Sequence, residues 1–159
     1  MDTQNRFHTA GTYWLARAEQ VALFGLCGGL MLWHLDALNW GRGLIAFSII
    51  DIVGYLPGAI AYRYQRGGTI APVYHYLYNF AHTYLVVGAG VGVWAWVTGG
   101  VEWAMLAVPL HLSIDRGIFG NVFKPLTLAF EPVAAPPDVV TMALGRNTLD
   151  RQAGMKRHV

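Results

Sequence analysis

The stretch HYLYNFAHTYL, from His75 to Leu85, decides how the rest of the sequence is interpreted. It places His75, Asn79 and His82 at positions i, i+4 and i+7 of an otherwise apolar segment. This spacing puts the three side chains on one face of a helix. If that helix crosses a membrane, the polar face needs partners within the protein, because lipid offers none. We therefore expect it to line the interior of a helical bundle.

The composition is that of a membrane protein. Of 159 residues, 55% are hydrophobic and only 13% are charged, and the formal net charge is +2. This charged fraction is too low for an ordinary soluble domain. The Lys and Arg residues are scattered rather than interleaved with aromatic residues, which excludes a nucleic-acid-binding surface.

The apolar segments predict an all-α, polytopic integral membrane protein with four transmembrane helices. The expected spans are residues 13–33, 43–62, 72–97 and 101–123. Residues 1–12 form a polar N-terminal segment, residues 13–124 the membrane domain, and residues 125–159 a polar tail that contains prolines. In the third span, Gly88, Gly90 and Gly92 would let a neighbouring helix approach closely.

The positive-inside rule gives the orientation. In a four-span arrangement one side carries nearly all the cations: Arg6, Arg17, Arg63, Arg66, Lys124, Arg146, Arg151, Lys156 and Arg157. The other side has only Arg42, opposed by Asp36 and Glu102. We therefore expect both termini to be cytoplasmic, with the protein in the bacterial inner membrane and the lipid bilayer as its first partner.

Polar residues from several spans are expected to meet inside the bundle. With a rise of about 1.5 Å per residue, Asp51, His82 and His111 come out near the midplane. Imidazole and carboxylate groups from facing helices are the usual ligands of zinc and non-haem iron. We predict that these three residues bind a divalent metal.

The remaining polar residues of the spans have candidate roles around that metal. Asp115 and Glu19 lie on the cytoplasmic side and are predicted to be catalytic, as base or as partner of an imidazole. The predicted supporting residues are Asn79, Tyr55, Arg116 and His75. One alternative is a site without metal, in which a histidine acts as the base. Another is a structural ion pair of Asp51 or Asp115 with Arg116. For His75 the alternative is a bond to water or headgroups, and for Asn79 a purely interhelical role.

The order of these motifs resembles a small bacterial integral membrane family known as domain of unknown function 4260. The resemblance covers about residues 14–125, and YN-x-AHTYL at 78–85 is its most specific part. It also includes Glu19, DxxGYL at 51–56, and His111 followed by DRG at 115–117 and Lys124-Pro125. Residues 117–124 read GIFGNVFK, which is longer than the GYGLK pattern at this place in the family. The resemblance implies a helical membrane protein and no particular activity.

Two classes of function fit the sequence. One is a membrane-embedded enzyme that uses a metal to hydrolyse or oxidise a lipid-like or apolar substrate. The other is a non-catalytic accessory subunit of a larger membrane complex, or a homo-oligomer, which would suit the small size and the many glycines. A transporter is disfavoured, since the chain lacks inverted repeats. Haem or chlorophyll binding by His34 or His75 is a further alternative.

Overall fold

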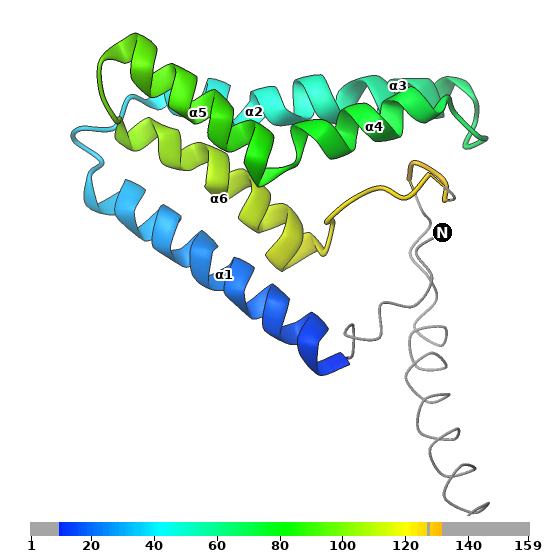
Figure 1. The fold of residues 1–159 in the computed structure, drawn as a ribbon, viewed down its shortest axis with the longest axis horizontal. Coiled ribbons are helices and arrows are strands. Elements are labelled where there is room, and N and C mark those ends of the chain that lie inside the picture. The colour runs from blue at the N-terminus through cyan, green and yellow to red at the C-terminus, as the bar shows by residue number, and fades with distance from the viewer. Residues whose placement is uncertain (1–9, 127, 132–159) are drawn as a thin grey trace, which may run out of the picture.

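The computed structural model describes residues 10–126 and 128–131, and within them the fold is all-α (Figure 1). The elements are, in chain order, α1 (Ala10–Trp33), α2 (Trp40–Gly54), α3 (Leu56–Tyr64), α4 (Pro72–Ala81), α5 (Tyr84–Thr98), the 3₁₀ helix η1 (Trp103–Leu106), α6 (Ala107–Ser113) and the π-helix η2 (Ile114–Phe119). The predicted helical class is confirmed.

The number of membrane crossings agrees with the prediction only in part. Helix α1 is long and apolar enough to cross a membrane by itself. The pairs α2–α3 and α4–α5 reach that standard only as bent units, with bends of 40° and 55°. The fourth predicted span corresponds to η1, α6 and η2, which do not form a candidate span by length and hydropathy.

The third predicted span is not one continuous helix, which corrects the sequence-based expectation. Helix α4 ends at Ala81, His82 is its C-cap, and α5 begins at Tyr84. The hydroxyl of Thr83 accepts a hydrogen bond from the Val86 amide (3.2 Å) and so caps the new helix. A threonine cap offers the backbone a partner outside the regular helix. The break therefore lies directly at the histidine of the predicted site.

The second predicted span is also interrupted. It begins at Trp40 rather than residue 43, because the Asn39 side chain accepts from the Arg42 amide (3.0 Å) as an N-cap. It then breaks at Tyr55, and a proline occupies the first turn of α3. Proline lacks an amide hydrogen and is tolerated only in a first turn. Both bends thus have a local cause in the sequence.

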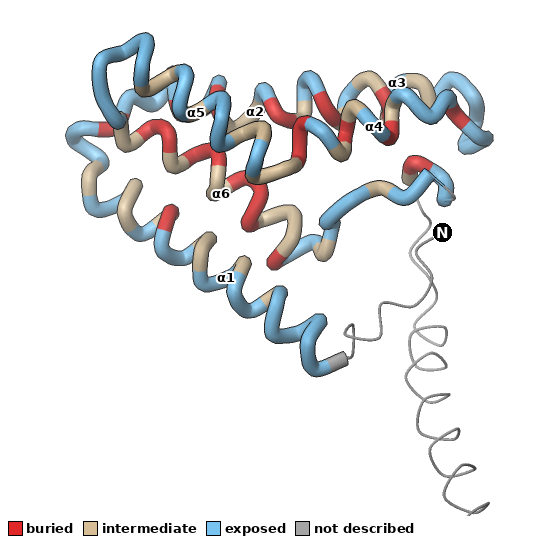
Figure 2. Tube along the Cα trace, in the orientation of Figure 1, coloured by how far each residue is buried: buried red, intermediate tan, exposed pale blue. Residues whose placement is uncertain are grey.

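Helix α6 is the centre of the packing. Helix α1 packs against α6 and η2, while α2 packs against α4 and α6, so α6 lies between α1 and the α2–α5 layer (Figure 1). Burial is concentrated along α6 and recurs at intervals along α2 and α4 (Figure 2). The main core cluster consists of Ala46, Ile50, Ala107, Val108 and Leu112.

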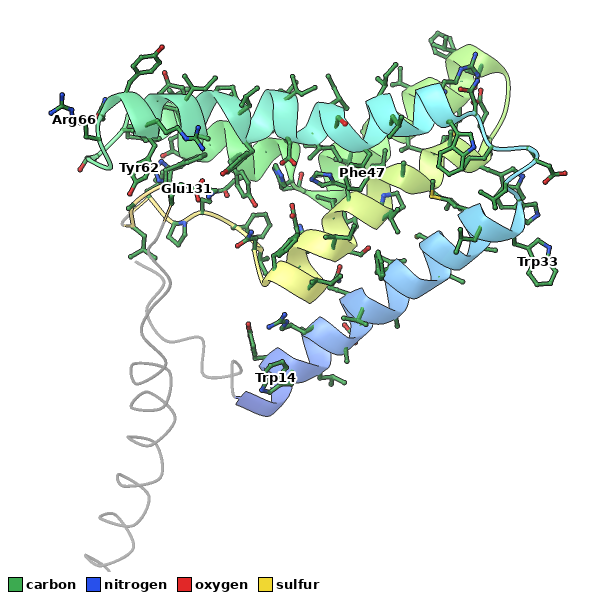
Figure 3. The ribbon with its side chains drawn as sticks, turned by 180° about the vertical axis from the view of Figure 1, so that it is seen from behind. Trp14, Trp33, Phe47, Tyr62, Arg66 and Glu131 are labelled. Atoms are coloured by element: carbon green, nitrogen blue, oxygen red, sulfur yellow. The ribbon has the colours of Figure 1, made fainter. Side chains whose placement is uncertain are left out.

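Residues 121–126 and 128–131 fold back from η2 onto α3 and α4, and we name these two stretches together the strap. Phe130 anchors it: its side chain is 1% exposed and packs with Ile70 and Tyr78. A side chain at Gly58 would collide with the Phe130 ring, so the close approach requires glycine there. The Tyr62 hydroxyl donates to the Glu131 carbonyl (3.2 Å; Figure 3). The first residues of the predicted tail therefore belong to the packed fold.

The outer surface is strongly apolar. Helix α5 has no buried residue, and large side chains such as Trp33, Leu85 and Val101 are more than four-fifths exposed. Exposed apolar surface on this scale is typical of lipid-facing helices. The expected close approach of a neighbouring helix to Gly88, Gly90 and Gly92 is not found, since within the described residues no atom lies within 4 Å of where their Cβ atoms would stand.

Candidate metal centre

Four elements each bring one polar residue to the centre of the molecule. Asp51 comes from α2, His82 from the end of α4, His111 from α6 and Asp115 from η2. Both imidazole rings are almost completely buried, at 2% and 3% exposure, whereas Asp51 is half-exposed. Donor atoms of Asp51, His82 and His111 all lie within 4.8 Å of one another. The structure thus brings together the three residues that we expected to bind a metal.

The carboxylates and imidazoles alternate around the centre. The Nε2 atom of His82 lies 3.3 Å from Asp51 Oδ1 and 3.5 Å from Asp115 Oδ2. The Nε2 atom of His111 lies 3.6 Å and 3.5 Å from the same two oxygens. Each histidine nitrogen therefore faces both carboxylates, and each carboxylate faces both histidines.

The tautomer of His82 is set by its backbone partner. Its Nδ1 atom lies 2.9 Å from the Tyr78 carbonyl oxygen, and a carbonyl can only accept, so Nδ1 carries the hydrogen. In a neutral ring Nε2 then carries no hydrogen, and its lone pair is directed at the Asp51 carboxylate. Two acceptors at this separation repel unless a proton or a metal ion lies between them. Donation of Nδ1–H to a carbonyl is also the usual arrangement of metal-binding histidines.

His111 has the same need for a partner. Both ring nitrogens are buried and neither makes a hydrogen bond to any described residue. A buried polar nitrogen left without a partner costs about 1–3 kcal/mol. The Phe47 ring contacts the imidazole edge-on, with centroids 4.7 Å apart, so one side of the ring is apolar (Figure 3). A cation bound at Nε2 would satisfy the side that faces the carboxylates.

The spacing of the donor atoms suits a small divalent ion. A tetrahedral ion with bonds of about 2.0–2.1 Å separates its ligand atoms by about 3.3–3.4 Å. The Asp51 Oδ1 atom lies 3.3 Å from His82 Nε2 and 3.6 Å from His111 Nε2. Two imidazoles with one or two carboxylates are a ligand set used by zinc and by non-haem iron.

The π-helix η2 positions Asp115. His111 and Asp115 are at positions i and i+4, but the helix widens at Ile114, between them. Single π-turns inside helices are rare and often lie at functional sites. The carbonyls at the end of η2 are held by Arg17 of α1, whose Nε donates to Gly117 (2.9 Å) and whose Nη2 donates to Ile118 (2.6 Å). Arg17 thus fixes the element that carries Asp115.

A second layer of aromatic and basic side chains surrounds His82. The Tyr78 ring stacks on the imidazole, with centroids 3.9 Å apart and planes inclined by 17°. The Lys124 ammonium lies 4.9 Å from the Tyr78 ring centroid. Arg116 donates from Nη2 to the His82 carbonyl (2.7 Å). These contacts hold the ring in place through its neighbours rather than through the nitrogen that faces the carboxylates.

A polar pocket of about 290 Å³ lies directly beside the cluster. Its walls include both carboxylates of the centre, together with Tyr55, Tyr78, Phe119, Asn121, Lys124 and Glu131. The Lys124 ammonium is already engaged, since it donates to the Phe130 carbonyl (2.5 Å) and lies 3.5 Å from Glu131 Oε1. Burial lowers the pKa of the Lys124 ammonium, and the Glu131 carboxylate opposes that shift. The pocket gives a small molecule room to reach the centre.

Comparison with known proteins assigns no family and no function to the chain. No family model, curated protein or solved structure matches this chain. The resemblance to the small membrane family therefore stays a prediction. The function of the centre must be argued from its own residues.

The other predicted site residues have separate positions. Tyr55 lines the polar pocket, as its spacing from Asp51 indicated. Glu19 is exposed on α1 and is not part of the cluster. Arg116 forms no ion pair with a described carboxylate, so the alternative of a structural pair with Asp51 or Asp115 is wrong.

His75 and Asn79 hold the strap rather than the centre. His75 is 3% exposed and its Nε2 donates to the Leu128 carbonyl (3.3 Å), where one alternative had placed water or headgroups. Asn79 makes two hydrogen bonds to the backbone of Lys124, at 2.7 and 3.0 Å. Asn79 therefore joins α4 to the strap, which differs from the interhelical role that one alternative gave it.

Three important residues were missed in the sequence. Arg17 and Lys124 were given no role at the site, and Phe130 was assigned to the polar tail. The only sequence signal was an aromatic residue, Phe130, within a segment that otherwise resembled a polar tail. A buried aromatic at such a place indicates that the segment returns to the core.

Proposed function

We propose that the chain is a metal-dependent enzyme of the membrane that hydrolyses an ester or amide bond. The observation that carries the proposal is the group of Asp51, His82 and His111, whose donor atoms lie within 4.8 Å of one another at the wall of a polar pocket. Two imidazoles and one carboxylate leave positions open for water and substrate. Asp115 then remains as a base beside them.

The residues can be assigned to steps of a hydrolysis. A divalent metal held by His82, His111 and Asp51 would polarise the substrate carbonyl and acidify a water. Asp115 accepts a proton from the attacking water as the new carbon–oxygen bond forms. It returns that proton to the leaving oxygen or nitrogen as the acyl bond breaks. Water supplies the only other atoms, so the reaction needs no oxidant.

Elemental analysis of protein purified in mild detergent tests the proposal. We expect about one zinc or iron per chain in the natural protein, and almost none after His82→Ala or His111→Ala. The matched control is His34→Ala, because His34 stacks on Trp103 outside the cluster and its loss should leave the metal content unchanged. Folded, metal-free natural protein after incubation with both ions would refute the proposal.

One observation favours the accessory-subunit alternative. Helix α5 is apolar, has no buried residue and exposes three glycines to open space. Such a face could pack against another membrane helix as well as against lipid. Recovery of a stoichiometric partner in mild detergent, lost on Gly90→Leu, would support it. Recovery of monomers with bound metal would favour the enzyme.

A further inference from the structure

A second pocket adjoins the polar pocket beside the centre. It measures about 270 Å³ and shares three wall residues with its neighbour: Tyr78, Asn121 and Lys124. The two pockets meet at these three side chains, so a single molecule that extends past them would occupy both. Each is near the lower limit for a ligand site, about 300 Å³, and together they lie well within that range.

The two pockets differ in chemistry. The pocket beside the centre is lined by Asp51, Asp115 and Glu131. The adjoining pocket is lined mainly by the strap, and apart from the three shared residues its walls are apolar: Gly120, Val122, Phe123, Pro125, Leu128 and Ala129. It is thus the less polar of the two pockets, so a polar group is favoured beside the centre and a hydrocarbon chain against the strap.

A third cavity is an alternative binding site for the hydrocarbon chain. It measures about 300 Å³, is apolar, and lies between α5 and the η1–α6 segment. Its walls include Tyr84, Gly88 and Val91, and it shares no wall residue with the polar pocket. A chain in this groove would therefore not be continuous with a group held at the centre.

We propose that the substrate is a single-chain amphiphile whose polar group binds beside the centre and whose chain lies in the strap pocket. The inference rests on the proposed metal-dependent function. The polar group is an uncharged ester or amide rather than a phosphate. Apart from the proposed metal ion, the only cation among the described walls of the polar pocket is Lys124, which is already paired with Glu131, and the carboxylates of Asp51 and Asp115 would repel a phosphate.

Hydroxamates of different chain length test the inference, because the same metal-binding head can be attached to a short or a long chain. Binding of acetohydroxamate and octanohydroxamate to zinc-loaded protein is measured by calorimetry in one detergent. We expect the long chain to bind at least about tenfold more tightly, since each buried methylene adds to affinity. Ala129→Trp, which fills the strap pocket from an exposed position, should abolish that advantage and leave acetohydroxamate binding unchanged.

Gly88→Leu is the matched control, because it fills the α5 groove at a position where a side chain meets no described atom. It should leave the chain-length advantage intact. If Gly88→Leu removes the advantage and Ala129→Trp does not, the chain lies in the groove and the inference is wrong. Equal binding of both hydroxamates would also refute it while leaving the metal site standing. Protein that retains neither zinc nor iron would refute the proposed function itself.

Discussion

His82 is the residue on which the candidate centre depends most. Its amide donates to the Tyr78 carbonyl, its Nδ1 donates to the same oxygen, and its ring stacks on Tyr78. It also lies at the end of α4, where the backbone is free to turn. One residue thus ends a helix, fixes its own tautomer and presents a nitrogen to both carboxylates.

The space around His82 gives a sharp prediction at Gly54. A Cβ there would lie 2.7 Å from the Ala81 Cβ and 3.0 Å from the His82 ring. We expect Gly54→Ala to displace the imidazole, lower the metal content at least severalfold and destabilise the protein by about 1–3 kcal/mol. Elemental analysis and thermal unfolding in detergent measure both effects.

Gly88→Ala provides the comparison for Gly54→Ala. No described atom lies within 4 Å of its Cβ position, so the change should retain the metal and stabilise the helix by about 0.5–1 kcal/mol. Equal metal content in the two variants would show that the contact at Gly54 does not control the histidine.

Substitution of Asp115 should lower catalysis without removing the metal. We expect Asp115→Asn to keep nearly one metal per chain and to lower hydrolysis of p-nitrophenyl decanoate by about 10²–10⁴-fold, because the proton acceptor is lost. Glu19→Gln changes an exposed carboxylate away from the cluster and should leave the rate unaltered. Loss of the metal from Asp115→Asn would instead make Asp115 a ligand.

At the scale of elements, the strap depends on Phe130. Its ring is buried against Ile70 and Tyr78, so Phe130→Ala should weaken the strap by about 3–5 kcal/mol. Hydrogen exchange of the Lys124 amide, which bonds to Asn79 Oδ1 at 2.7 Å, should accelerate accordingly. Leu126→Ala, at a half-exposed position of the same segment, should leave that exchange slow. Unchanged exchange in Phe130→Ala would contradict the anchoring role.

The sequence predicted the helical elements better than their interruptions. Long apolar segments identify helices because hydrophobicity is read over many residues. The break at Thr83 depends on one hydroxyl, and an isolated threonine in an apolar run is also common inside helices. The π-turn at Ile114 leaves no sequence pattern that we recognise. The return of the strap depends on long-range packing of Phe130, which local periodicity does not report.

The site was predictable for a geometric reason. Residues at similar depth on packed antiparallel helices come together if their faces match, and this holds for Asp51, His82 and His111. Glu19 lies at a suitable depth but on an exposed face of α1, so it does not point toward the other polar residues. Asp115 satisfied both, because it follows His111 by one turn.

At the scale of the whole molecule, the exposed apolar surface predicts insertion in a lipid bilayer with a defined orientation. In a Cys27→Ser background, we expect Gly100→Cys to react with a membrane-impermeant maleimide in intact cells. Arg66→Cys, in the basic turn between α3 and α4, should react only after the membrane is opened. The reverse pattern would invert the orientation, and labelling of both sites in intact cells would contradict a membrane-spanning arrangement.

The central claim is that two histidines and a carboxylate hold one metal ion. X-ray absorption at the edge of the metal retained by the purified protein measures this most directly. We predict nitrogen and oxygen neighbours at about 2.0–2.2 Å, with the outer-shell scattering of two imidazoles in the natural protein and almost no metal edge in His111→Ala. A metal surrounded by sulfur, or by water oxygens with no imidazole signal, would contradict the claim.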